Sequence, residues 1–227
     1  APAAPPMAPL KLRIPDSHTA LPGEAGGTAA PSLAALADLR PLGQIHDSFI
    51  VAAGRDGLWL IDQHVAHERI LFEKILRGQA AGKLEVQALL MPLILELTPA
   101  QMVDYGRIAS DLDATGFETE PFGPRSIAIK AAPAAVPPGE IEKLLFEILE
   151  IADAELRGVS MEDVRRGIAA SVACRAAIKI NTPLEERKMA WLIEELAATE
   201  YPMSCPHGRP IALVYSTRDI LKGFHRV

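Results

Sequence analysis

The chain has 227 residues, of which 49% are hydrophobic, and 29 acidic side chains against 23 basic ones give a formal net charge of −6. This composition is sufficient for one or two domains with a real core, and the absence of a membrane-length apolar run or a signal peptide predicts a cytoplasmic protein without a membrane partner. The acidic balance argues against a protein that coats DNA nonspecifically, and two distant cysteines predict free thiols, available as metal ligands, rather than a disulfide framework.

The first segment, residues 1–41, differs in composition from the rest. It holds eight of the 19 prolines and eleven alanines, with little periodic apolar pattern. Such a composition favours a flexible linker. Because the chain begins with Ala1 rather than methionine, we expect a fragment whose upstream part was joined by this linker.

The first ordered elements are predicted to be a β-hairpin, starting near Gly43, and a helix. Ile45–Ala53 and Leu58–Ile61 have the apolar, β-branched composition of strands, and turn residues separate them. From Gln63 to about Leu76 the apolar period becomes helical, with Asp62 as the N-cap.

The rest of the chain is predicted to alternate strand pairs with helices, which gives an α+β (mixed α/β) architecture. The expected strands are Leu84–Leu97 (interrupted by Pro92), Phe117–Pro121, Ser126–Ala132 and Ile211–Ser216. The expected helices are Ala100–Thr115, Glu140–Arg157, Met161–Ile180 and Pro183–Thr199, followed by a short one from Thr217.

The densest polar cluster is DQHVAHER at positions 62–69. On a helix that starts here, His64 and Glu68 share one face, and Asp62 at the cap can turn its carboxylate toward the same end. One imidazole and two carboxylates form half of a shell for a divalent cation. Asp62 as only a cap and His64 as only a packed polar residue fit the segment equally well. Glu73 lies roughly 140° around the helix from Glu68, which favours a structural salt bridge.

A second cluster is CPHGRP at positions 205–210. In an extended segment the side chains of Cys205 and His207 would point the same way. Cys174, on a predicted helix, is the other thiol and is either a further ligand or a buried apolar residue. Thiolate and imidazole suit zinc, whereas carboxylate and water suit manganese or magnesium. Arg209 is expected to form a loop salt bridge or to contact phosphate.

These motifs together resemble those of a known family, the C-terminal domain of the DNA mismatch-repair protein MutL in its endonuclease-bearing form. The segment DQHVAHERILFE at 62–73 is similar to the family's DQHAxxExxxxE, with Val65 where alanine is usual. The other matching segments are ACR at 173–175, CPHGRP at 205–210 and FHR at 224–226. The resemblance covers about Pro41 to Val227.

The resemblance implies one metal site, with catalytic roles for its first three members. Its residues would be Asp62, His64, Glu68, Cys174, Cys205 and His207. The implied cofactors are a structural or regulatory Zn²⁺ and a catalytic Mn²⁺ or Mg²⁺. The resemblance also implies a homodimer, in which 42–83 and 161–227 form a dimerization subdomain that carries the metal site and 84–160 a smaller regulatory subdomain.

Further partners are implied for the same reason. QALLMP at 87–92 resembles the QxxLxP segment by which such domains engage the replicative sliding clamp, through Gln87, Leu90 and Pro92, although 89–95 can equally be a buried strand. The missing upstream part would be an ATPase domain that binds ATP, and the full-length protein would interact with the mismatch-recognition protein MutS.

The leading hypothesis is therefore a metal-dependent nuclease that nicks duplex DNA during mismatch repair. Its acidic charge predicts weak DNA binding and dependence on recruitment. The alternative is a non-catalytic dimerization or scaffold module with a structural zinc. A zinc hydrolase of small substrates is a third class, supported only by the ligand types, because the zinc-protease, P-loop, GxSxG and dinucleotide motifs are absent from the sequence.

Overall fold

The computed structural model describes residues 36–82, 84–155 and 161–226. Most of the predicted linker, residues 1–35, lies outside the described part. Leu36 and Leu39 are buried, and the first strand begins at Arg40, three residues before the predicted start of order. These two leucines pack in the same apolar cluster as the first sheet, which explains the earlier start.

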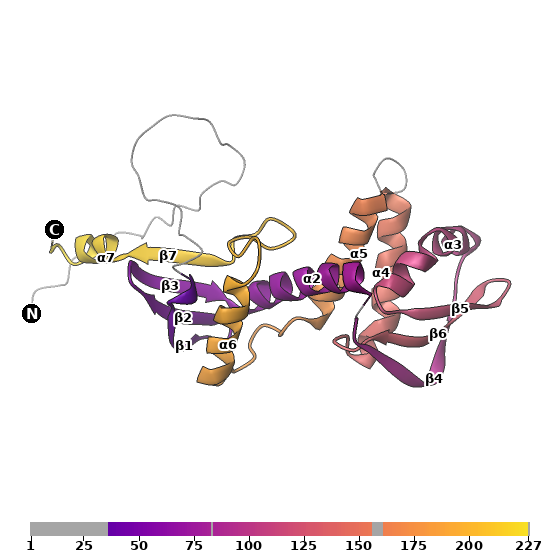
Figure 1. Cartoon of the computed structure of the whole chain (residues 1–227), viewed down its shortest axis with the longest axis horizontal. Helices are drawn as coiled ribbons and strands as arrows, with labels where there is room; N and C mark the ends of the chain where they lie inside the picture. The colour runs from indigo at the N-terminus through magenta and orange to yellow at the C-terminus, as the bar shows by residue number, and fades with distance from the viewer. Residues whose placement is uncertain (1–35, 83, 156–160, 227) are drawn as a thin grey trace, which may run out of the picture. The chain divides into compact units, whose positions relative to one another are not determined.

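The first sheet is antiparallel and has four strands in the order β1-β2-β3-β7 (Figure 1). Their bounds are β1 Arg40–Ile45, β2 Phe49–Gly54, β3 Gly57–Asp62 and β7 Ala212–Ser216. The β-hairpin predicted from the strands Ile45–Ala53 and Leu58–Ile61 is confirmed as β2 and β3, but the first strand starts later than predicted, because the chain turns between β1 and β2. His46 and Asp47 adopt φ values of 51° and 46° there. Residues of these types tolerate the left-handed region, so neither glycine nor proline marks the turn.

Helix α2, Gln63–Ala81, follows β3 directly. The predicted N-cap is confirmed, since Asp62 Oδ1 accepts hydrogen bonds from the backbone N–H groups of His64 at 3.0 Å and Val65 at 3.1 Å. The helix runs one turn beyond the predicted end and stops at Gly82, whose φ of 61° suits a left-handed C-cap.

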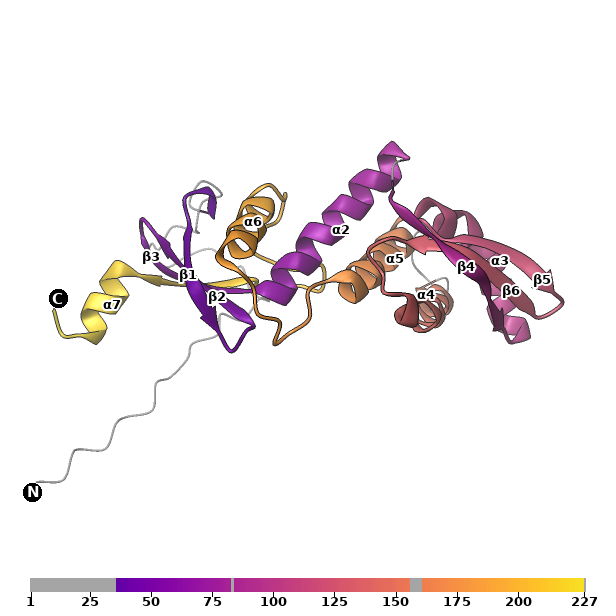
Figure 2. The ribbon, with the colours of Figure 1, turned by 90° about the horizontal axis from the view of Figure 1, so that it is seen from below.

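The second sheet has three antiparallel strands in the order β4-β6-β5 (Figure 2). These are β4 Val86–Glu96, β5 Glu118–Gly123 and β6 Ser126–Pro133. The remaining helices are α3 Pro99–Ala114, the 3₁₀ turn η1 Pro138–Glu140, α4 Ile141–Glu155, α5 Met161–Ala176, α6 Glu186–Ala197 and α7 Thr217–Gly223. The α+β architecture is confirmed. No helix in the described ranges is both long and apolar enough to cross a membrane.

Buried apolar side chains form two clusters, and α2 contributes to both. Val65, Ala66 and Ile70 pack with the four-stranded sheet and α6. Phe72 and Ile75 pack with the second sheet and with α3, α4 and α5. Glu68 therefore lies on the turns of α2 where its packing passes from one cluster to the other.

Candidate metal centre

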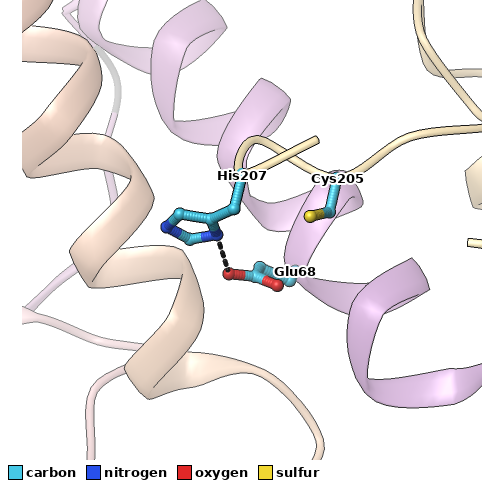
Figure 3. Close-up of side chains that lie close together, drawn as sticks. All are labelled: Glu68, Cys205 and His207. Carbon is cyan, nitrogen blue, oxygen red and sulfur yellow. Dashed lines mark ion pairs between the residues drawn. The ribbon is translucent and has the colours of Figure 1, made fainter. Parts of the chain in front are cut away.

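Glu68, Cys205 and His207 lie together, although they are far apart in sequence (Figure 3). Glu68 comes from α2, and the other two come from the segment between α6 and β7. One ligand atom from each lies within 4.8 Å of the others, and His207 Nδ1 is 3.1 Å from Glu68 Oε1. Glu68 is 3% exposed and Cys205 2%, whereas the side chain of His207 is 49% exposed. The group is thus a buried site with one side open to solvent.

The chemistry of this group fits a divalent cation. Glu68 Oε1 is buried and accepts no hydrogen bond within the described part of the chain, even though His207 Nδ1 is close. A buried carboxylate oxygen without a partner is unfavourable, and a cation would compensate it. Carboxylate, thiolate and imidazole are the donors that zinc takes in proteins. Glu68, Cys205 and His207 are therefore suited to hold Zn²⁺.

The Cys205–His207 segment reaches Glu68 as a turn. The extended geometry predicted for it is wrong, because the N–H of Gly208 donates to the carbonyl of Cys205 at 2.9 Å and Gly208 has a φ of 79°. The N–H of Arg209 also donates to Cys205 Sγ at 3.3 Å. A bridge between Ser204 and Pro210 closes the turn at its base. We name residues 204–210 the metal turn.

Cys174 lies against the same carboxylate from α5. It is half-buried, and burial, followed by the negative charge of Glu68 and a hydrogen bond to it, raises the pKa of the Cys174 thiol. Cys174 is not one of the three residues whose ligand atoms lie within 4.8 Å. It is nevertheless close enough for Glu68 to influence its charge state.

Asp62 and His64 lie at the start of α2, outside that group of three. Asp62 uses Oδ1 for the two cap bonds. His64 Nδ1 is 2.8 Å from the carbonyl oxygen of Ile178. Because a carbonyl can only accept, Nδ1 carries the proton and Nε2 keeps a free lone pair. A histidine oriented in this way is typical of metal ligands.

His67 is a structural residue that the sequence analysis did not identify. Its Nδ1 accepts a hydrogen bond from the N–H of Ile178 at 2.9 Å, so His64 and His67 hold both backbone groups of that residue. Burial, with the positive charges of Lys188 and Lys74, lowers the pKa of His67 to about 4. The pair ties the segment after α5, and hence Cys174, to α2. Their spacing of three residues on one helix face was the available signal.

Two further predictions concern charged side chains near the centre. The salt bridge expected for Glu73 is present, with Arg69 Nη1 3.7 Å from Glu73 Oε1. The loop salt bridge considered for Arg209 is not found within residues 36–82, 84–155 and 161–226. The backbone of Arg209 engages the turn, through the contact of its N–H to Cys205 Sγ and through its carbonyl, which accepts from the Cys205 N–H.

The segment resembling a clamp motif lies on the edge strand β4. Pairing with β6 is interrupted between Ala88 and Leu93, so the intervening residues form a bulge. Leu90 is fully exposed and Met91 is 78% exposed, whereas Leu95 is buried. The amide of Gln87 donates to the carbonyl oxygens of Pro133 and Val136. Of the segment 89–95, for which a buried strand was the alternative, only Leu95 is buried, while Leu90, Met91 and Ile94 are exposed.

Comparison with known proteins identifies the family. Residues 42–184 match the model of the MutL C terminal dimerisation domain. The chain is 64% identical over 227 residues to the DNA mismatch repair protein MutL of Solibacter usitatus (strain Ellin6076), covering 100% of the chain and 34% of that protein. It is 56% identical over 194 residues to that of Koribacter versatilis (strain Ellin345), covering 86% of the chain and 30% of the relative. The chain thus spans about a third of the length of these relatives. It belongs to the family of MutL C-terminal dimerisation domains.

Proposed function

We propose that this chain is the endonuclease domain of a mismatch-repair protein and nicks duplex DNA with the help of a bound divalent cation. The observation that carries the proposal is the convergence of Glu68, Cys205 and His207, with Glu68 Oε1 buried and lacking a hydrogen bond in the described structure. A purely structural role does not require a buried carboxylate oxygen without a hydrogen bond in a site that opens to solvent at His207.

The ligands divide by chemistry into two sets. Cys174, Cys205 and His207, with Glu68, would hold a structural or regulatory Zn²⁺. Asp62 and Glu68 offer the oxygen donors that a catalytic Mn²⁺ or Mg²⁺ prefers, and His64 offers Nε2. When bound, such a cation supplies Lewis acidity toward water and the phosphodiester. The contact of His64 with the Ile178 carbonyl fixes the ring and its tautomer, so Nε2 is presented without reorganisation.

The domain would reach DNA mainly because other proteins recruit it, and only weakly through its own affinity for DNA. With a net charge of −6 the chain has little attraction for phosphate, but the guanidinium of Arg209 extends from the metal turn without an ion pair to the described residues. We propose that it contacts the DNA backbone. The exposed apex of β4, Leu90 to Pro92, would engage the sliding clamp, while ATP and MutS would act through the longer protein.

Homodimerization would use the outer face of the four-stranded sheet. Ile50, Trp59 and Ile61 fill the inner face. The opposite face carries two rows of paired residues, Val51–Leu60–Leu213 and Ala53–Leu58–Tyr215. Leu213 and Tyr215 are exposed large hydrophobic residues at its edge, as expected for an interface between copies. This sheet would form the core of the dimerization subdomain (42–83 and 161–227), with 84–160 as the regulatory subdomain.

The nuclease proposal is tested by nicking of supercoiled plasmid in Mn²⁺, with and without the sliding clamp. Asp62→Asn is the informative variant, because asparagine caps helices as well as aspartate does, so α2 is retained while a carboxylate is lost. We expect nicking to fall by at least about tenfold. Asp113→Asn, which alters an exposed carboxylate on α3, is the control and should nick as the wild type does. Equal rates for Asp62→Asn and wild type would refute the assignment.

A dimerization module with a structural zinc is the second candidate. It is favoured by one observation, that Asp62 and His64 lie outside the compact group formed by Glu68, Cys205 and His207. This alternative predicts that Asp62→Asn, which leaves Glu68, Cys205 and His207 in place, still dimerizes and still supports repair in cells. Loss of repair by a dimeric Asp62→Asn protein would favour the nuclease.

A further inference from the structure

Two charged residues of α2 contact the backbone at the base of the metal turn and just before it. Arg69 and Glu73 follow Glu68 on the helix, and their side chains are only 6% and 12% exposed. Arg69 Nε donates to the carbonyl oxygen of Ser204 at 2.6 Å. Glu73 accepts from the N–H groups of Glu200 at 2.9 Å and Tyr201 at 3.3 Å. Together they contact the backbone of the segment that leads into Cys205.

The guanidinium of Arg69 is fixed from several sides. Its central carbon lies 5.5 Å from the ring centre of Phe72 and 5.9 Å from that of Tyr201. Glu73 pairs with it one helical turn away. A planar guanidinium that already lies near two aromatic rings loses little further freedom when it donates a hydrogen bond, so the contact to Ser204 is well defined.

The metal turn is internally closed, so its base determines where its ligands lie. The Ser204–Pro210 bridge and the bond from the Cys205 N–H to the Arg209 carbonyl, 2.9 Å long, join its two ends. Ser204 immediately precedes Cys205. A shift of the base would therefore move both Cys205 and His207 relative to Glu68. Arg69 itself hydrogen-bonds to Ser204 and not to either of these two ligands.

We propose that Arg69 and Glu73 form a latch that positions the metal turn over Glu68 and thereby sets the metal affinity of the site. They are positioning residues and not ligands. This inference rests on the proposed metal site, since it concerns the geometry of that site. It also assigns a role to the last glutamate of the 62–73 motif, which lies on the wrong side of α2 to reach the ion.

The test uses the whole 227-residue chain and Co²⁺ alone as the probe, because its absorption reports both binding and thiolate coordination. Arg69→Met and Glu73→Ala are expected to weaken Co²⁺ binding by about 10–100-fold, the usual effect of removing a partner that orients ligands. Lys74→Met is the matched control. Lys74 is the next residue after Glu73, and its ammonium pairs with Glu195 of α6 at 2.6 Å. Its affinity should stay within about twofold of the wild type.

A second measurement separates the latch from general stability and from the metal proposal. Hydrogen exchange of the Gly208 and Arg209 amides in the metal-free protein should accelerate in the latch variants and not in Lys74→Met. If either latch variant fails to fold, Glu73→Gln, which retains one acceptor oxygen, should show an intermediate loss. Unchanged affinity and exchange in Glu73→Ala, or equal losses in Lys74→Met, would overturn the inference. If the wild type binds no Co²⁺, the metal site fails, and exchange alone decides the latch.

Discussion

Replacing Glu68 with glutamine is expected to have opposite effects on stability with and without metal. In the metal-free protein, Glu68 places a carboxylate in the interior, where Oε1 accepts no hydrogen bond from the described residues. Glutamine has nearly the same shape and carries no charge. The substitution therefore removes the desolvated charge while keeping the packing between the two apolar clusters.

The magnitude follows from the surroundings of the side chain. A buried polar group without a partner costs about 1–3 kcal/mol. The nearby His207 and the hydrogen bond with Cys174 offset part of this cost. We therefore expect Glu68→Gln to raise the free energy of unfolding in chelator by about 1 kcal/mol. With Zn²⁺ at about 100 times its dissociation constant, the wild type should gain about 2.7 kcal/mol and the variant much less, which inverts the order.

Urea unfolding in EDTA and in Zn²⁺ measures both effects. Asp111→Asn is the matched control. Asp111 is also 3% exposed, but its Oδ1 accepts a hydrogen bond from Arg165 Nε at 2.6 Å. Removing a charge that is already paired should destabilise the protein by about 1–3 kcal/mol in either condition. A Glu68→Gln protein that is less stable than the wild type in EDTA would refute the reasoning that Glu68 is poised for a cation.

Three further outcomes are expected. Burial lowers the pKa of His67 from 6.5 to about 4, so the contribution of neutral His67 to stability is complete above about pH 6.5 and is lost as the pH falls toward 4. The difference in free energy of unfolding between wild type and His67→Gln should therefore shrink by up to about 3 kcal/mol over this range. Parallel pH profiles of the two proteins would contradict this. Leu213→Glu should yield monomers in analytical ultracentrifugation, whereas Val103→Glu, an exposed position on α3, should remain dimeric. Arg209→Gln should reduce nicking about tenfold without altering Co²⁺ affinity, and a matching loss of affinity would assign the side chain to the turn instead.

Local signals in the sequence predicted the start of α2 well. Asp62 precedes a clear helical period, and its carboxylate accepts the cap bonds that such a position needs. The same periodicity placed His64 and Glu68 on one helix face. The end of α2 was predicted one turn too early, because the apolar pattern fades before Gly82, the left-handed C-cap at which the helix stops.

What the sequence could not provide was the contact between distant segments. Arg69 meets Ser204 across 135 positions, and no local pattern encodes that distance. The turn at His46 and Asp47 was missed because these residues adopt left-handed backbone angles without glycine. The metal turn was misread as extended, because CPHGRP shows neither the hydrogen bond that closes it nor the helix against which it packs.

The acidic composition and the arrangement of the site bear on each other. Asp62 and Glu68 place two negative charges where, in the proposed nuclease, a phosphate must approach, and the chain as a whole adds a net charge of −6. In the proposed nuclease these charges would repel DNA when no cation is bound, and a single arginine such as Arg209 would not offset them. A divalent ion would neutralise both carboxylates at the point of contact. Metal occupancy would then determine whether DNA can enter the site, and recruitment by a clamp would determine where the domain acts, so the proposed nuclease would need little intrinsic affinity for DNA.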